Sequence, residues 1–196
     1  MSTALTPTIN DGLTRSLQGI AVEDFDRIVR EHQKRIYRVL LFLLRDADAA
    51  DTLTQECFLR AYEKRGAFRG DCRIETWLLR IATNLARDHV RNRRAGFWSR
   101  LVGIDSSGPD GTKLEFPAPQ PSPERTLLVR REAEAVWLAA AALPARQRTI
   151  FVLRFAEEMA LDEISQVLGL REGTVKSHLF RAVNAVRDKL KESQWR

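Results

Sequence analysis

A proline-rich stretch divides the chain in two, and this division limits the fold more than any other feature of the sequence. Residues 99–124, SRLVGIDSSGPDGTKLEFPAPQPSPE, contain five of the seven prolines of the 196-residue chain. Prolines interrupt helices, and glycines and serines loosen the backbone. We therefore expect a flexible linker at residues 96–124, folded domains at residues 22–95 and 125–196, and a mobile tail at residues 1–21.

Both expected domains carry apolar residues at the spacing of amphipathic helices. In the first, apolar residues recur every three or four positions from Phe25 to Val90, with charged residues between them. The same periodicity resumes at Thr126 in the second. Strand signal is essentially absent. The sequence therefore predicts an all-α fold of two small helical domains.

Composition and motifs argue against several classes of protein. The longest apolar run, residues 39–44 (VLLFLL), is far shorter than the roughly 20 residues of a membrane span, and the N-terminus lacks a secretory signal. We expect a cytoplasmic protein with no membrane insertion. Neither a P-loop nor a nucleophile–base constellation is present, so we expect no enzyme and no cofactor. The cysteines and histidines are too scattered for a metal site; Cys57 is expected in the core, and Cys72 has no assigned role.

Positive charge is concentrated in one segment. The chain has a net charge of +6, and residues 60–100 hold eleven Lys or Arg against four Asp or Glu. This concentration is typical of a surface that contacts a polyanion, while a solvated helix face is the alternative. A basic helix on a membrane surface is a further alternative, but the rest of the domain can bury the apolar stripe of this helix.

Residues 161–190 have the layout of a helix-turn-helix. Gly169 can adopt the left-handed conformation that ends the first helix, and Gly173 lies in the first turn of the second. Apolar residues then form one inward face on each helix. The residues that define this motif are Leu161, Glu163, Ile164, Val167, Leu168, Gly169, Gly173, Val175 and Leu179.

The second helix of this motif has an outward face of mixed chemistry. Lys176, Ser177, Phe180 and Arg181 fall outside its apolar stripe. Such groups can hydrogen-bond base edges and phosphates and can pack against thymine methyls in a major groove. For Phe180, covering the edge of the core or meeting a partner helix are the alternatives.

Two further features lie in the first domain. Asp46, Asp48, Asp51 and Glu56 surround an expected helix start, where acidic residues favour the helix dipole, yet Asp51, Gln55 and Glu56 also share one face that can bind a partner. The loop that follows, FRGDCRI at residues 68–74, places an aromatic ring among glycine and charged residues.

Together these residues resemble the extracytoplasmic-function (ECF) class of bacterial RNA polymerase sigma factors. Residues 46–94 (DADAADTLTQECFLRAYEKRGAFRGDCRIETWLLRIATNLARDHVRNRR) resemble the second sigma domain, and residues 143–190 (LPARQRTIFVLRFAEEMALDEISQVLGLREGTVKSHLFRAVNAVRDKL) resemble the fourth. The resemblance covers about residues 22–95 and 126–191, and the first and third domains of larger sigma factors have no counterpart.

The resemblance implies a role for each surface. Asp51, Gln55 and Glu56 would dock on the beta-prime clamp helices of core RNA polymerase, whose beta flap is a second expected contact. Promoter DNA and an anti-sigma factor are the other expected partners. Lys176, Ser177, Phe180 and Arg181 would read −35 duplex, and the melted −10 strand would be captured by Phe68, Arg69, Asp71, Ile74, Trp77, Arg80, Asn84, Arg87 and Arg91. Within this set, Trp77 is expected to anchor the loop to the core.

Several residues depart from the family pattern. Ala50 replaces an acidic residue that is common beside Asp51, and Cys72 stands where a Ser-like residue is frequent, which leaves the base preference of the loop open. Ala160 and Arg171 stand where Ser-like helix caps are common, at a cost of about 1 kcal/mol each if nothing else satisfies the amides.

Two other functions remain alternatives at this point. A helix-turn-helix activator or repressor that never joins polymerase would explain the second domain, but it would leave the acidic face and the loop without a role. A helical scaffold protein with no DNA role would leave the basic segment as a solubilising feature only.

Overall fold

The computed structural model describes residues 19–100 and 123–194, and within these ranges the chain is helical and contains no strand. The predicted all-α fold is confirmed. The helices are α1 (Val22–Leu44), α2 (Ala47–Lys64), a short 3₁₀ helix η2 (Arg65–Ala67), α3 (Ile74–Arg100), α4 (Pro123–Ala141), α5 (Ala145–Phe155), α6 (Leu161–Leu168) and α7 (Glu172–Gln194). Most of the expected tail and linker lies outside the described residues, so the domain boundaries remain a prediction.

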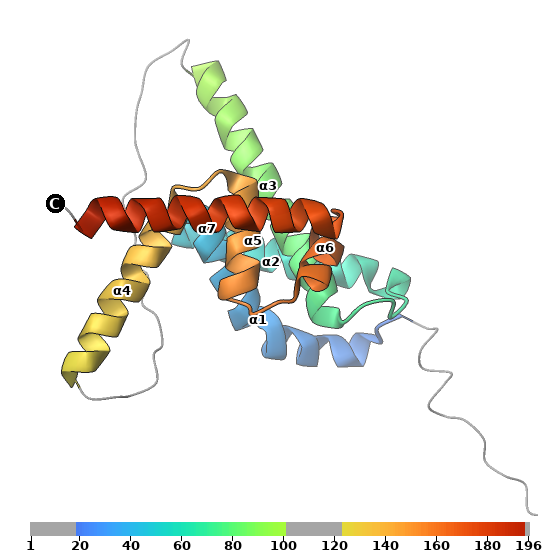
Figure 1. Ribbon diagram of the computed structural model, residues 1–196. Coiled ribbons are helices and arrows are strands. Elements are labelled where there is room, and N and C mark those ends of the chain that lie inside the picture. The colour runs from blue at the N-terminus through green and yellow to red at the C-terminus, as the bar shows by residue number, and fades with distance from the viewer. Residues whose placement is uncertain (1–18, 101–122, 195–196) are drawn as a thin grey trace, which may run out of the picture.

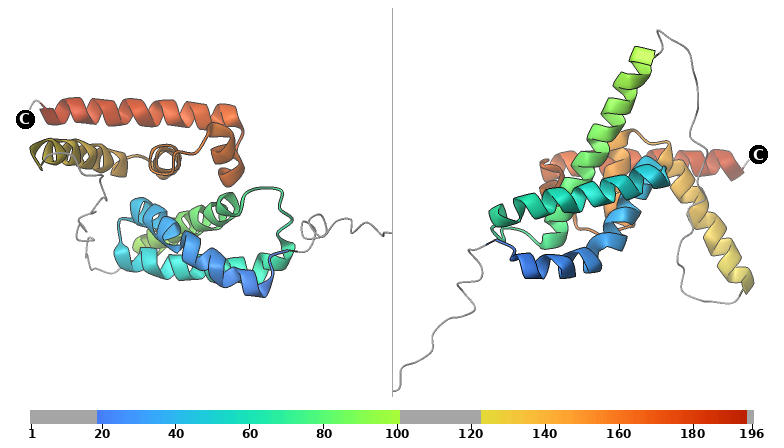
Figure 2. Two further views of the ribbon diagram at one scale, coloured as in Figure 1. Left: turned by 90° about the horizontal axis from the view of Figure 1, so that it is seen from below. Right: turned by 180° about the vertical axis from the view of Figure 1, so that it is seen from behind.

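The helices form two layers that face each other (Figures 1 and 2). One layer contains α1, α2 and α3, and the other contains α4, α5, α6 and α7. Between the layers, α1 packs against α5 and α3 packs against α6. In the left view of Figure 2, α7 forms the outer edge of its layer, on the side away from α1–α3.

The turn between α1 and α2 shows how the local sequence sets the first layer. Arg45 ends α1 in the left-handed region (φ 57°), and its N–H donates to the carbonyl of Leu41 at 2.8 Å. Asp46 follows in an extended conformation, and its carboxylate accepts the N–H of Ala49 at 3.0 Å. An aspartate in this position satisfies one of the free N–H groups at a helix start. So short a connection makes α1 and α2 neighbours.

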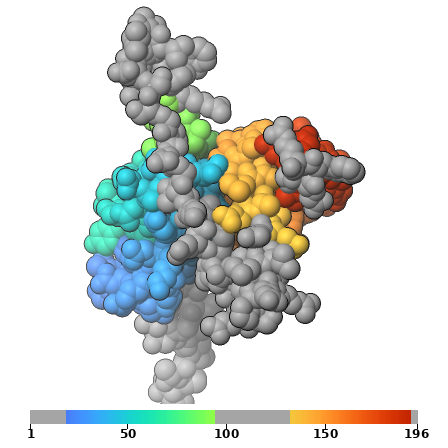
Figure 3. Space-filling model, turned by 90° about the vertical axis from the view of Figure 1, so that its left-hand side faces the viewer, coloured from blue at the N-terminus to red at the C-terminus, as the bar shows by residue number. Residues whose placement is uncertain are grey.

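A continuous apolar core crosses from one layer to the other. Leu40, Leu78 and Leu79 of the first layer and Leu153 and Ile164 of the second are fully buried, and they belong to one cluster. A second, smaller cluster lies among α4, α5 and α7. The two halves of the chain lie side by side in the space-filling view (Figure 3). The proline-rich stretch thus divides the sequence, while the core joins the two halves.

The helix-turn-helix has the predicted local geometry. Gly169 ends α6 with φ 63°, and Gly173 lies in the first turn of α7. The N–H of Leu170 donates to the carbonyl of Ser165 at 3.0 Å, which closes the turn. At the start of α6, Ala160 has no capping side chain, but its own N–H donates to the Glu163 carboxylate at 2.9 Å.

The described helices include none with both the length and the apolar character of a membrane span.

Candidate nucleic-acid interface

The outward face of α7 is exposed as the sequence predicts. Lys176, Ser177 and Arg181 are exposed, and the ring of Phe180 is 69% exposed. On the opposite side of the helix, Val175 and neighbouring apolar residues are buried. The Phe180 ring therefore does not belong to the core of the chain. Two cations, a hydroxyl and an aromatic ring therefore lie together on a surface that can enter a groove of DNA.

Hydrogen bonds and an ion pair within α7 hold these side chains in place. The hydroxyl of Ser177 donates to the carbonyl of Gly173 at 2.9 Å, and Nε of Arg181 donates to the carbonyl of Ser177 at 3.2 Å. Lys176 pairs with Glu172 one turn earlier at 2.8 Å. These bonds are exposed, so a phosphate or a base edge can replace them at little cost.

His178 lies beside this face without adding to its charge. Burial lowers the pKa of His178, and the nearby positive charges of Arg181 and Arg146 lower it further. Because its pKa falls below the ordinary value, the imidazole is neutral at pH 7 and the positive charge of the face comes from lysine and arginine.

The acidic residues of α2 separate into a structural and a surface group. Asp46 caps the helix and also pairs with Arg93 of α3 at 3.2 Å, so it is occupied within the chain. Asp51 and Gln55 lie on the exposed surface and are joined by a hydrogen bond of 3.0 Å, which places both on one face. Glu56 lies beside them and pairs with Arg60 at 2.6 Å. The capping interpretation therefore holds for Asp46, while partner binding by the surface group remains a prediction.

The loop before α3 does not leave its aromatic residue isolated. The rings of Phe68 and Trp77 lie 5.1 Å apart at an interplanar angle of 44°, and both residues are half-buried. Arg69 and Asp71 are exposed beside them, and Gly70 turns the loop with φ 75°, a conformation that favours glycine. Phe68 and Trp77 form an apolar shelf, with charged groups at its rim, on which a flat ligand can stack.

The basic face of α3 has both exposed and covered parts. Arg80, Arg87 and Arg91 are exposed, whereas Asn84 is half-buried. Asp88 lies within 3.4 Å of Arg91 and 3.7 Å of Arg87, and so reduces the positive charge at this end.

The middle of α3 faces the second layer. Asn84 and Arg87 line a cavity of about 660 Å³, whose other walls include Leu143 and Leu168. The guanidinium of Arg80 reaches the turn of the helix-turn-helix, where a β-carbon on Gly169 would lie 3.7 Å from its Nη2. The residues predicted for the −10 strand thus fall into two groups. One is the half-buried shelf at the start of α3, and the other is the middle of α3, where Asn84 is half-buried against the second layer and the arginines stay exposed.

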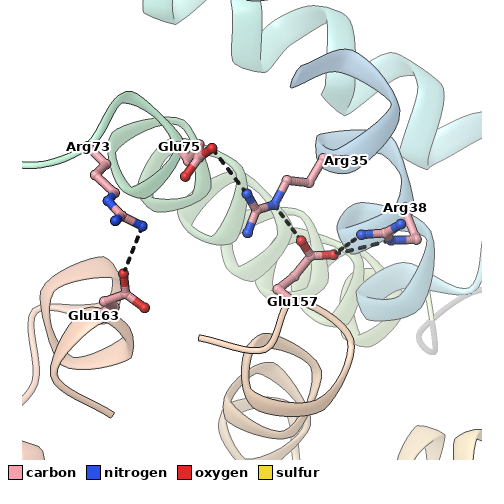
Figure 4. Close-up of polar contacts among 6 residues, drawn as sticks. All are labelled: Arg35, Arg38, Arg73, Glu75, Glu157 and Glu163. Carbon is pink, nitrogen blue, oxygen red and sulfur yellow. Dashed lines mark hydrogen bonds and ion pairs between the residues drawn. The ribbon is translucent and has the colours of Figure 1, made fainter. Parts of the chain in front are cut away.

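Sequence reasoning missed the ionic contacts between the layers. Glu157 lies between Arg35 and Arg38, and Glu163 faces Arg73 (Figure 4). The partners of Glu157 are 122 and 119 positions away, so no local pattern could pair them. No group of three or more potential metal ligands occurs in the described part of the chain.

Comparisons with known proteins agree with this arrangement. The family description "Sigma-70 region 2" matches residues 28–96, and "Sigma-70, region 4" matches residues 133–186. The chain is 36% identical over 165 residues to the RNA polymerase sigma-H factor of Pseudomonas aeruginosa, covering 83% of each chain. It is 29% identical over 170 residues to the ECF sigma factor SigW of Bacillus subtilis, covering 86% of this chain and 89% of the relative.

A solved structure shares the fold. The sigma factor RpoE of Bartonella quintana, determined in complex with the anti-sigma factor NepR, matches with a TM-score of 0.69 at 22% sequence identity. The match covers 87% of this chain and 98% of that one.

The two cysteines should differ in reactivity. Burial raises the pKa of the Cys57 thiol to about 12, and this thiol lies 3.6 Å from the carbonyl of Leu78, whereas Cys72 is half-buried in the loop. Since the thiolate is the nucleophile, we expect a disulfide reagent at pH 8 to titrate one thiol in the folded protein and two in denaturant. Cys72→Ser should abolish the fast-reacting thiol, and a rapid reaction of Cys57 in the folded protein would contradict its burial.

Proposed function

Because the chain belongs to the ECF class of RNA polymerase sigma factors, which act in transcription initiation, we propose that it binds core RNA polymerase and recognises −35 duplex and melted −10 DNA. The observation that carries the proposal is the match to sigma regions 2 and 4 in that order, each falling on one of the two helical layers. The chain would act by binding and would leave the chemistry to the polymerase.

The α7 face supports a role in reading duplex DNA. Lys176 and Arg181 can neutralise phosphates or donate to guanine, and Ser177 can bond to a phosphate or a base edge. Phe180 is the member whose exposure has no explanation within the chain. An apolar contact with a thymine methyl would bury this ring and give it a role in specificity.

The shelf before α3 supports capture of unpaired DNA. A base that leaves the duplex loses stacking and pairing worth a few kcal/mol. Stacking on an aromatic side chain returns about 1–3 kcal/mol per base, and arginines along the strand add phosphate contacts. Phe68 and Trp77 offer such a surface, with Arg69 beside it. Capture can therefore favour melting without hydrolysis of a nucleotide by this chain.

The exposed acidic face of α2 supports docking on polymerase. Asp51 and Gln55 are exposed and hydrogen-bonded to each other, and Glu56 lies beside them. We propose that these residues bind the beta-prime clamp helices and that the second layer binds the beta flap. An anti-sigma factor is a further proposed partner, since the Bartonella quintana relative was solved with one.

Reconstitution with core polymerase separates this function from that of a helix-turn-helix regulator. We expect the purified chain to convert core polymerase into an enzyme that starts transcripts at defined sites on genomic DNA fragments from its own organism. Reversing two charges, with Asp51→Arg and Glu56→Arg, should reduce specific transcripts about tenfold or more, because like charges across an interface cost several kcal/mol. Glu63→Arg, at an exposed position on the same helix, is the matched control. An absence of specific transcripts with the unchanged protein would contradict the proposal.

Removing one aromatic ring tests the outward face of α7. We expect Phe180→Ala to weaken binding to −35 duplex by roughly 1 kcal/mol, about fivefold, as for the loss of one base-pair contact. The probe is the duplex upstream of a start site mapped in the reconstituted reaction, measured by mobility shift. Phe155→Ala removes another half-exposed ring from the same layer and should leave this binding unchanged. Equal losses for the two variants would indicate a general packing defect.

The −10 assignment predicts a defect at a later step. We expect Asn84→Ala to reduce the yield of open complex, detected by permanganate reactivity of unpaired thymines, while closed-complex formation stays the same. The Asn84 amide can hydrogen-bond to an unpaired base only after the duplex has melted, so its loss affects only the formation of the open complex. An unchanged yield of open complex would remove Asn84 from the capture surface.

A further inference from the structure

A carboxylate buried between the two layers has its charged partners on the opposite layer. The side chain of Glu157 is 1% exposed, and it follows α5 in the second layer. One of its oxygens accepts from Nε of Arg35 at 2.5 Å, and the other accepts from Nη2 and Nε of Arg38 at 2.8 and 3.2 Å (Figure 4). Arg35 also lies 3.5 Å from Glu75 of α3. A single carboxylate thus joins the second layer to α1.

The turn that carries Glu157 is held firmly. The N–H of Glu157 donates to the carbonyl of Val152 at 3.3 Å, and the N–H of Met159 donates to that of Leu153 at 3.1 Å. Between them Glu158 has φ 54°, a left-handed conformation that costs a residue other than glycine free energy. The backbone therefore presents the Glu157 carboxylate to α1 as a fixed group.

Ion pairs of this kind can break at little net cost in free energy when two surfaces separate. Removing a carboxylate from water costs several kcal/mol, and the attraction to its partners only about offsets this cost. Here the arginines keep 28% and 46% of their side-chain surface exposed, so all three groups regain water readily when the layers part. Breaking one side of the pair while the layers stay closed would instead leave a buried charge without a partner.

The closed arrangement partly covers one proposed DNA surface, at the half-buried Asn84, and leaves the others exposed. Asn84 and Arg87 line the cavity against the second layer, and Arg80 reaches Gly169 in the helix-turn-helix. The outward face of α7 and the Asp51 and Gln55 pair remain exposed. The closed chain therefore has its duplex face and docking face available, while the second layer restricts access to Asn84 in the middle of α3.

We propose that Glu157, Arg35 and Arg38 form an ionic latch that keeps the free chain closed and holds the second layer against Asn84 in the middle of α3 until polymerase is bound. This inference rests on the proposed function for the role of Asn84. The positions named −35 and −10 are about 25 base pairs apart, or about 85 Å at 3.4 Å per base pair. Two layers in direct contact cannot span this distance, so the chain must open to contact both elements.

The reactivity of a cysteine at position 84 measures opening without any DNA. Asn84→Cys is placed in a Cys72→Ser background and treated with a maleimide coupled to a 5-kDa polyethylene glycol, whose bulk slows reaction at this half-buried position while the layers are closed. Cys57 remains buried, with its pKa raised to about 12, and contributes little labelling. When closing is faster than labelling, the labelling rate reports the open fraction. We expect Glu157→Gln to increase this rate about tenfold, since the neutral amide loses the charge-assisted hydrogen bonds to both arginines.

Glu158→Gln is the matched control. It removes the same charge from the adjacent, exposed residue, for which the described residues supply no ion pair, and it should leave the labelling rate unchanged. Arg38→Gln breaks the same contact from the α1 side and should also increase the labelling rate. This variant tests the latch if Glu157→Gln fails to fold. Combining the two should add less than the sum of their effects, because they break one contact.

Equal labelling rates for the parent, Glu157→Gln and Arg38→Gln would overturn the latch. This result would leave the proposed function intact, because that function is tested by transcription with core polymerase. Conversely, faster labelling in both variants together with an absence of specific transcripts would support the latch and refute the proposed function.

Discussion

The packing of α5 and α6 against α1 and α3 is the contact on which the rest of the structure depends. It continues the apolar core across the two layers, from Leu40 and Leu78 to Leu153 and Ile164. It also places Glu157 beside Arg35 and Arg38, and the helix-turn-helix above the middle of α3. Because this contact joins the inner sides of both layers, the acidic face of α2 and the outward face of α7 remain on the outside.

The interface combines two kinds of interaction with different consequences for opening. Apolar contacts such as the Phe42 and Trp137 rings, 4.6 Å apart, favour closure without regard to charge. The Glu157 ion pairs select one alignment of the layers, since any other alignment buries a carboxylate without a partner. A docking partner that supplies comparable apolar contacts to each layer can therefore replace the closed state.

Local patterns predicted the elements and several details of the site. The glycines of the helix-turn-helix lie where the sequence placed them, with Gly169 left-handed and Gly173 in the first turn of α7. Asp51 and Gln55 share a face because residues four apart on a helix are neighbours. Phe68 shows where local pattern stops: the sequence places its ring among glycine and charged residues, and in the structure the ring packs against Trp77, nine positions later, where α3 brings it within reach.

The sequence by itself determined the helices, the division into two halves, the turn of the helix-turn-helix and the chemistry of each exposed face. These features depend on residues within one or two turns of each other, and periodicity and turn residues encode them directly. The tertiary structure alone decided that the two halves share a core, that Asn84 faces a cavity, and that Glu157 meets arginines 119 and 122 positions away. Pairings at such separations leave no periodic signal, because they depend on how whole helices pack.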